Sequence, residues 1–214
     1  MVILDIPQRS EEWYSAKCGI PSSSCFSQIV TSKGAKSKSA EGYMYELAGQ
    51  RITGKIEDSY VDADIQRGIN SEEEARDLFE IIKGINVEQV GVCLDDKEKY
   101  LCSPDGLISV DGTFSNTLTA EGVSSGIEIK CPKMKTQAKR LIENVLPSEY
   151  FHQVQGSMLI TGTSHWYFMS YYPAMPPLII RVERDAVFCV ALKNALDQFC
   201  ADLDSLTEQI RNMI

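Results

Sequence analysis

Ser103-Pro104-Asp105-Gly106, followed after a loop by Glu128-Ile129-Lys130, is the part of the sequence that decides the predicted fold. Apolar residues on both sides of the Pro-Asp-Gly turn predict strands over 100–102 and 107–110. The second motif lies on a short predicted strand over 126–131, on which side chains two positions apart project from the same face. Glu128 and Lys130 therefore point together, and Ile129 points the opposite way into the core. The pattern predicts an α/β protein with these polar groups at one edge of its sheet.

The side chains of the two motifs suit phosphodiester hydrolysis. Asp105, Glu128 and the main-chain carbonyl of Ile129 offer the oxygen ligands that Mg²⁺ prefers. Metal ions lower the pKa of a bound water and neutralise charge on the pentavalent transition state. The ammonium of Lys130 would orient the attacking water and stabilise the same charge, and with a depressed pKa it would also accept the proton of that water. The pattern therefore predicts a metal-dependent nuclease.

Each of the two motifs has a simpler interpretation when it stands alone. An ExK sequence on a strand is most often a solvated face with a salt bridge, and Pro-Asp-Gly is most often only a turn. Here a turn, a loop and an apolar strand separate the two motifs in the order that a metal centre requires. Their combination favours the nuclease.

The remaining sequence predicts one α/β domain over residues 1–214, because no repeat, low-complexity tract or Pro/Gly linker divides it. Apolar periodicity and capping residues predict helices over 10–17, 21–30, 40–53, 68–83, 134–144, 148–161 and from Asp185 onward. Further strands are expected over 87–92, 165–172 and 178–183, with polar loops over 31–39 and 111–125.

Two of the predicted helices carry clear apolar faces. In the helix over 68–83, the residues that share one face are Ala75, Leu78, Phe79 and Ile82. The C-terminal helix carries a heptad-like stripe made of Cys189, Leu192, Leu196, Phe199, Leu203, Leu206 and Ile210. We expect this stripe to pack on the sheet, and a coiled-coil partner is the alternative.

The composition excludes several classes of protein. With 43% hydrophobic and 24% charged residues, the chain is neither disordered nor collagen-like. No apolar run approaches the roughly 18 residues that span a bilayer, and the N-terminus lacks the features of a signal peptide. We therefore expect no membrane association and a place in the cytoplasm. The seven cysteines are scattered and form no CxxC, which argues against a disulfide framework, a zinc site or an iron–sulfur cluster.

The net charge of −9 argues against a protein that simply coats DNA through a basic surface. A nuclease with acidic metal ligands still fits, because bound metal ions restore positive charge at its centre. Basic residues also gather locally, in one group formed by Lys33, Lys36 and Lys38 and in another formed by Lys133, Lys135, Lys139 and Arg140.

A series of short motifs runs through the chain in a fixed order. They are Trp13 with Gly19-Ile20 and Ser24; Arg67-Gly68 with Glu72 and Ala75-Arg76; Cys102 to Leu107; Glu128 to Pro132; Gln153-Val154-Gln155 with Ser157-Met158; Trp166 to Phe168; and Glu183 to Asp185. Together they resemble the YqaJ-like viral recombinases, the family of the phage lambda exonuclease within the PD-(D/E)xK nucleases. Single motifs are weak, but their order over residues 13–185 is specific.

The resemblance implies a restriction-endonuclease-like core, in which a central mixed β-sheet is flanked by α-helices, and a site with two Mg²⁺ ions that Mn²⁺ can replace. Asp105 would bind both metal ions, and Glu128 with the carbonyl of Ile129 would complete the ligands of one. Lys130 would activate the water. Glu72 matches the family's helix glutamate beside the metal site; its simpler interpretation is a surface charge at a helix start, which the helix dipole favours.

The resemblance also implies a pocket for a 5′-phosphate. Gln153 matches a glutamine that holds a terminal or scissile phosphate, and Ser24 and Ser103 match hydroxyls of the pocket. By sequence alone these three are an exposed helix residue, a helix-start residue and a turn residue. Lys17 stands where the lambda-type enzymes carry an arginine, and lysine keeps the charge but lacks the planar two-pronged donor. Either the preference for 5′-phosphorylated ends is weaker here, or another basic residue contributes.

The implied activity is 5′-to-3′ digestion from double-stranded DNA ends, which releases mononucleotides and leaves 3′ single strands for phage-type homologous recombination. The implied setting is a bacterial host that carries the phage or prophage gene, with a single-strand annealing recombinase as partner. A homotrimeric ring would keep an acidic protein on DNA by enclosing it, with Lys33, Lys36 and Lys38 on the inner wall. The alternatives are a structure-specific endonuclease or junction resolvase with the same metal centre, and a DNA-binding module with a decayed site.

Overall fold

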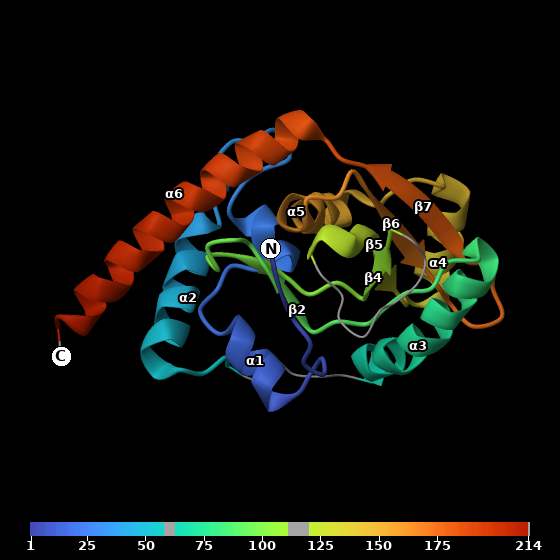
Figure 1. Cartoon of the computed structure of the whole chain (residues 1–214), viewed down its shortest axis with the longest axis horizontal. Helices are drawn as coiled ribbons and strands as arrows, with labels where there is room; N and C mark the ends of the chain where they lie inside the picture. The colour runs from blue at the N-terminus through green and yellow to red at the C-terminus, as the bar shows by residue number, and fades with distance from the viewer. Residues whose placement is uncertain (58–62, 111–119, 214) are drawn as a thin grey trace.

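The computed structural model describes residues 1–57, 63–110 and 120–213, and the strands within these residues form two sheets (Figure 1). An antiparallel sheet contains, in order, β1 (Val2–Leu4), β2 (Val92–Leu94) and β3 (Leu101–Cys102). A mixed sheet contains, in order, β4 (Gly106–Ser109), β5 (Val123–Lys130), β6 (His165–Ser170) and β7 (Leu178–Glu183). In the mixed sheet β5 and β6 run parallel, and the two outer pairs are antiparallel.

Helices flank the mixed sheet, which confirms the predicted fold class (Figure 1). The α-helices are α1 (Glu11–Lys17), α2 (Ala40–Thr53), α3 (Ala63–Lys83), α4 (Met134–Glu143), α5 (Phe151–Thr161) and α6 (Ala186–Arg211). Short 3-10 helices are η1 (Ser23–Gln28), η2 (Ala120–Gly122) and η3 (Ser148–Tyr150). None of the helices in the described ranges is long and apolar enough to cross a membrane.

Pro104 lies between the two sheets. β3 ends at Cys102 and β4 begins at Gly106, so the chain changes sheet within Ser103-Pro104-Asp105. Proline has no N–H to donate to a strand ladder, and pairing therefore cannot continue through this turn. Because Gly106 pairs with Ile127, the turn leaves Asp105 at the start of β4 and beside the end of β5.

Successive side chains of β5 point to opposite faces of the mixed sheet, one toward α3 and the other toward α5. Ile129 belongs to an apolar cluster with Phe79 of α3. A second cluster joins Trp166 of β6 to Met158 of α5. Glu128, next to Ile129 in the strand, points away from the α3 layer and toward α5. The fold thus presents a buried carboxylate between a sheet and a helix.

The close packing of Gly126 against Trp166 gives a test of this sheet. A Cβ at Gly126 would lie 2.2 Å from the indole ring of Trp166, which is fully buried and has no room to move. We expect Gly126→Ala to destabilise the protein by about 1–3 kcal/mol through overpacking. Thermal denaturation should show the melting temperature falling by roughly 2–4 °C per kcal/mol.

Gly42 of α2 is the matched control for this substitution. A Cβ there meets nothing within 4 Å, and the residue lies inside a helix. Gly42→Ala should raise the melting temperature, because alanine is favoured over glycine in a helix by about 1 kcal/mol. Equal effects of the two substitutions would contradict the packing described for Gly126.

Capping residues predict several helix ends correctly. The side chain of Ser10 accepts a hydrogen bond from the N–H of Trp13 at the start of α1. Asp185 does the same for the N–H of Phe188 at the start of α6. Gly54 ends α2 in the left-handed conformation, with φ 68°, which glycine adopts without strain.

Other predicted boundaries are wrong. The segment 21–30 forms the tighter 3-10 helix η1 in place of an α-helix, and α3 begins at Ala63 rather than at 68. β5 begins at Val123, inside the predicted loop over 111–125, of which 111–119 lies outside the described residues. The strand predicted over 87–92 is divided, because Glu88 forms an isolated bridge with Leu107 and β2 begins only at Val92. Gly91 lies between them, and a Cβ there would lie 2.4 Å from Ile6, so only glycine allows this close approach.

The predicted apolar face of α3 holds only in part. Ala75 and Phe79 are buried, whereas Ile82 is 48% exposed and its neighbour Ile81 is 79% exposed. The apolar cluster on this side of the sheet takes in Ala75, Leu78 and Phe79. Helical periodicity continues to the end of α3, but the apolar surface that it covers ends one turn earlier.

The apolar stripe of α6 packs on helices, not on the sheet as predicted. Phe199 stacks on Tyr43 of α2 with ring centroids 5.9 Å apart, and Phe188 contacts Phe151 of α5 at 4.7 Å. Figure 1 shows α6 as the long helix that runs along one side of the molecule beside α2 and ends at the C-terminus. Most of the stripe is buried within this chain, which accounts for its periodicity without a coiled-coil partner.

Candidate active site

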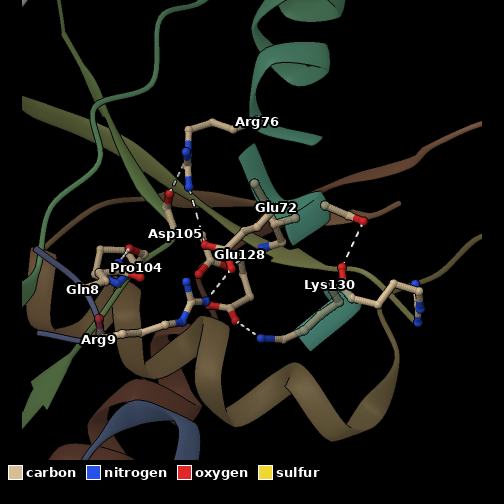
Figure 2. Close-up of polar contacts among 12 residues, drawn as sticks. Gln8, Arg9, Glu72, Arg76, Pro104, Asp105, Glu128 and Lys130 are labelled. Atoms are coloured by element: carbon tan, nitrogen blue, oxygen red, sulfur yellow. Dashed lines mark hydrogen bonds and ion pairs between the residues drawn. The ribbon is translucent and has the colours of Figure 1, made fainter. Parts of the chain in front are cut away.

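The turn before β4 and the end of β5 bring Asp105, Glu128 and Lys130 together (Figure 2). Asp105 is held by the neighbouring strand, because its Oδ2 accepts a hydrogen bond of 2.6 Å from the main-chain N–H of Ile129. Glu128 is 2% exposed, and its Oε1 accepts a hydrogen bond of 2.7 Å from Nε2 of Gln153 on α5. Lys130 forms an ion pair with the same carboxylate oxygen.

Burial and mutual repulsion determine the charge of this cluster. Burial raises the pKa of Asp105 well above its usual range, and the nearby Glu128 raises it further. Burial likewise raises the pKa of Glu128, against the opposing effect of Lys130. Burial disfavours the charge on Lys130, but the two carboxylates outweigh it and raise the Lys130 pKa above its usual value. Lys130 is therefore an ammonium in this arrangement, which favours an orienting and charge-stabilising role over that of a base.

The oxygen atoms beside Asp105 fit a hard divalent cation. The N–H and C=O of one strand residue point to the same side of the strand. Since the N–H of Ile129 points at Asp105, its carbonyl also points toward Asp105, beyond the start of β4. Two carboxylates and this carbonyl form a donor set suited to Mg²⁺.

Lysine and arginine side chains of the protein form ion pairs with the glutamates in and beside the cluster. Glu128 is paired with Lys130, and Glu72 of α3 is paired with Arg9 at 2.8 Å and with Arg76 at 3.4 Å. Arg76 also donates to the main-chain carbonyl of Asp105 at 3.0 Å, which ties α3 to the turn. Within the described ranges, no three His, Cys, Asp or Glu side chains are arranged as a ready metal cage. A metal ion would have to replace some of these cationic contacts.

One cavity of about 170 Å³ joins this cluster to the residues predicted to bind a phosphate. Its walls include Asp105, Glu128 and Lys130. They also include the four residues of the predicted phosphate pocket, which are Lys17, Ser24, Ser103 and Gln153. The remaining lining residues are Gln8, Arg9, Trp13, Ser22 and Ser23. Segments far apart in the sequence thus meet at a single cavity.

Lys17 is a desolvated cation at this cavity. Its Nζ lies 3.6 Å from the centroid of the Trp13 ring, and burial lowers its pKa to about 8. Among the described residues, no carboxylate forms a salt bridge with Lys17. A partly buried cation that forms no salt bridge with a described carboxylate is suited to bind an anionic ligand.

The hydroxyl of Ser103 lines the cavity but is already engaged. Its Oγ donates to the carbonyl of Gly91 at 2.6 Å and accepts from the indole N–H of Trp13 at 3.0 Å. Ser103 therefore positions Trp13, on which Lys17 stacks. Ser24, by contrast, is exposed, and its Oγ lies 3.2 Å from that of Ser22. When Ser22 donates in this contact, the hydrogen of the Ser24 hydroxyl is available to a ligand.

Sequence reasoning missed several residues around the site. Gln8 and Arg9 line the cavity. Their place directly before the helix cap Ser10 is the feature of the sequence that could have indicated them. The ring of Tyr150 lies 5.5 Å from Nζ of Lys130, and its hydroxyl accepts a hydrogen bond of 2.9 Å from Arg140. Aromatic residues near a helix start are too common for sequence alone to indicate such a contact.

Three other residues have different surroundings from those expected. Arg140, predicted as part of a basic surface group, is 5% exposed and bonded to Ser170. Gln155 of the predicted motif is buried and joins α5 to the end of β7 and the start of α6, because it donates to the carbonyl of Glu183 and accepts from the N–H of Asp185. His152, the neighbour of Gln153 in the sequence, is buried against Phe188 and does not line the cavity.

Comparisons with known proteins agree with this architecture. Residues 12–164 match the model of the YqaJ-like viral recombinase domain. No curated protein sequence matches the chain. The chain resembles the crystal structure of an alkaline exonuclease, LHK-Exo, from Laribacter hongkongensis, with 29% identity, a TM-score of 0.79, and coverage of 95% of this chain and 97% of that one.

Two further structures are similar to this chain. The complex of LHK-Exo with dAMP matches with the same identity and coverage and a TM-score of 0.80. A phage-related exonuclease from Haemophilus somnus 129PT matches at 14% identity with a TM-score of 0.66, over 89% of this chain and 96% of that one, which supports the fold alone. Because the family model spans most of the sequence, the chain belongs to the YqaJ-like viral recombinase family, as its motifs predicted.

Proposed function

We propose that this protein is a Mg²⁺-dependent 5′-to-3′ exonuclease that digests double-stranded DNA from its ends at the cavity formed around Asp105, Glu128 and Lys130. The observation that carries the proposal is that a carboxylate–lysine cluster and a desolvated cation, Lys17, line one cavity. A DNA end requires this combination, because the scissile bond and a charged terminus lie one nucleotide apart.

Family membership and structural likeness support the same class of activity. The YqaJ-like family and the two alkaline exonuclease structures indicate a DNA exonuclease, which is a hydrolase. LHK-Exo was crystallised with dAMP, a deoxynucleoside monophosphate. A compound of this kind is the expected product when this protein removes one nucleotide at a time.

The chain's own residues supply distinct parts of the reaction. Asp105, Glu128 and the carbonyl of Ile129 would hold the metal ions, and Mn²⁺ would substitute for Mg²⁺. A bound divalent ion supplies Lewis acidity and lowers the pKa of a coordinated water. Lys130 orients the attacking water and stabilises negative charge on the transition state. Gln153 fixes the carboxylate of Glu128 through its amide.

The remaining cavity residues would hold the DNA end. Lys17 provides positive charge in a site where burial strengthens electrostatic attraction. Ser24 provides a hydroxyl donor. The ring of Trp13 holds the ammonium of Lys17 through a cation–π contact. We assign these residues to the 5′-terminal phosphate, with Ser103 acting indirectly through Trp13.

The preference for 5′-phosphorylated ends should fall as the pH rises through about 8, where Lys17 loses its proton. A terminal phosphate is already dianionic above roughly pH 6, so only the lysine changes charge in this range. We expect the ratio of kcat/KM for 5′-phosphorylated over 5′-hydroxyl duplexes to fall roughly three- to tenfold between pH 7 and pH 9. Initial rates at several pH values measure this ratio.

Lys17→Arg is the matched control for the pH dependence. A guanidinium stays charged throughout this range, so the ratio for the variant should not change with pH. An identical fall of the ratio in the wild type and in Lys17→Arg would show that another group titrates.

Linear and covalently closed circular duplexes of the same sequence test the proposed function against its endonuclease alternative. The exonuclease should digest the linear duplex completely in the presence of Mg²⁺ and leave the closed circle intact. Cutting of the closed circle would favour a structure-specific endonuclease or junction resolvase. Inactivity on both substrates, with Mg²⁺ or Mn²⁺, would favour the binding module.

The biological setting that we propose is phage-type recombination in a bacterial cytoplasm, where the 3′ strands pass to a single-strand annealing recombinase. A homotrimeric ring would retain the DNA, since a net charge of −9 gives little general affinity for phosphates. Lys33, Lys36 and Lys38 are exposed on the loop before α2 and remain our candidates for the inner wall. The mass of the native protein in solution tests the ring.

A further inference from the structure

Arg9 is held in an unusual backbone conformation at the edge of the cavity. Its φ of 67° lies in the left-handed region, which residues other than glycine adopt only when their surroundings impose it. A tight turn imposes it, because the N–H of Ser10 donates a hydrogen bond of 3.2 Å to the carbonyl of Pro7 and places Arg9 at the third position of the turn. The amide of the neighbouring Gln8 anchors this turn, because it donates hydrogen bonds of 2.8 Å to the carbonyls of both Val90 and Pro104. The turn that carries Arg9 is thereby fastened to the turn that carries Asp105 (Figure 2).

The side chain of Arg9 extends from this turn along the cavity wall. Its Nη2 donates to Oε2 of Glu72 at 2.8 Å, and the side chain is 40% exposed. Figure 2 shows the guanidinium directed at the acidic centre from the side opposite Arg76. The contact with Glu72 therefore holds a planar cation in the wall of the cavity that also contains Asp105 and Glu128.

A purely structural ion pair does not account for these features. Arg76 already neutralises Glu72 from within α3, and its side chain is 11% exposed. A salt bridge to an arginine as exposed as Arg9 contributes little to stability. Glycine would also occupy the left-handed position without strain. The strained arginine is explained better by something that it binds.

We propose that Arg9 binds the 5′-terminal phosphate of the DNA and determines the preference for phosphorylated ends, an inference that rests on the proposed function. Lys17 supplies a compact charge without a planar pair of donors. A guanidinium presents several N–H groups in a fork, and Arg9 uses Nη2 for Glu72. Its other N–H groups are then suited to two parallel hydrogen bonds to phosphate oxygens. Arg9 and Lys17 line the same cavity and would hold the phosphate together.

Arg9→Gly tests the proposal without disturbing the turn, because glycine adopts the same backbone angle freely. Rates are measured on duplexes that differ only in a 5′-phosphate or a 5′-hydroxyl. We expect the ratio of kcat/KM for the two ends to fall by about tenfold or more in Arg9→Gly, with partial recovery in Arg9→Lys. An unchanged ratio, or an equal loss on both ends, overturns the assignment to the terminal phosphate.

Arg76→Gln is the control for loss of a Glu72 ion pair. Arg76 contacts Glu72 but does not line the cavity, so the ratio should stay at the wild-type value whatever happens to the overall rate. A fall of the ratio in Arg76→Gln equal to that in Arg9→Gly would show that Glu72, and not Arg9, matters for end recognition.

A binding measurement separates failure of this inference from failure of the proposed function. Inorganic phosphate and dAMP should each raise the melting temperature of the wild type, and Arg9→Gly should lose most of this rise. If the wild type digests DNA but Arg9→Gly keeps both the ratio and the rise, the inference is wrong and the exonuclease stands. If the wild type digests no DNA, the proposed function fails, and the melting temperatures alone decide whether Arg9 binds phosphate.

Discussion

Lys130→Met should slow digestion of linear duplex DNA by at least about 10³-fold at saturating DNA and Mg²⁺, because a positioned charge at the transition state is removed. Lys130 is the cation that contacts Glu128, and it lies on the same face of β5. Methionine keeps an unbranched side chain of similar size but carries no charge and no N–H. The loss should appear in kcat, measured by release of mononucleotides.

The same variant should still bind metal ions. Its carboxylates are intact and have lost a competing cation, so the rise in melting temperature with Mg²⁺ should equal or exceed that of the wild type. Lys193→Met is a suitable control, since Lys193 lies on the exposed face of α6 and its ion pair is with Asp197, one turn away on the same helix. Near-normal turnover of Lys130→Met would mean that the role given to Lys130 is wrong.

Asp105→Asn should abolish both digestion and stabilisation by metal. In the wild type, a ligand at 100 times its dissociation constant stabilises the fold by about 2.7 kcal/mol, or roughly 5–10 °C for a protein of this size. The variant should lose most of this rise. Asparagine keeps an oxygen that can accept the N–H of Ile129, so the turn should survive.

The metal-free form of Asp105→Asn should melt at a higher temperature than the metal-free wild type. Asp105 and Glu128 are buried side by side and repel each other when both are charged, and the amide removes that repulsion. The double variant Asp105→Asn/Lys130→Met should be no slower than either single variant, because the groups act as a unit. Additive losses would contradict a common centre.

The core of the site could be predicted from local sequence alone. Asp105 follows a proline that ends one strand, and Glu128 and Lys130 alternate with the buried Ile129 on another. Turn chemistry and the two-residue period of a strand are local rules, which hold whatever the tertiary packing. The same holds for the caps Ser10 and Gly54.

The phosphate-binding half of the cavity could not be predicted in this way. Lys17 and Ser24 lie far from Asp105 in the sequence and reach it through packing, so only the resemblance to a family indicated them. Arg9 matched no motif. It lies on a tight turn that Gln8 ties to the carbonyls of Val90 and Pro104, and a single sequence carries no sign of such contacts.

Burial of single residues was equally hard to predict where a long side chain was involved. The sequence predicts Arg140 to be part of a basic surface group, but its side chain is buried and donates hydrogen bonds to the hydroxyls of Ser170 and Tyr150. The periodicity predicts the apolar stripe of α6, but it does not predict that α2 and α5 cover the stripe. Periodicity shows that one face of a helix is buried, and it carries no information about the element that buries it.

Release of a terminal label from a linear duplex tests the central claim most directly. Two blunt duplexes of one sequence carry a label on the terminal nucleotide at either the 5′ or the 3′ end of the same strand, and products are separated after short incubation with Mg²⁺. A 5′-to-3′ exonuclease should release the 5′ label at once as a mononucleotide and keep the 3′ label in a long single strand. Early release of the 3′ label, or a 5′ label found in oligonucleotides, would contradict the account.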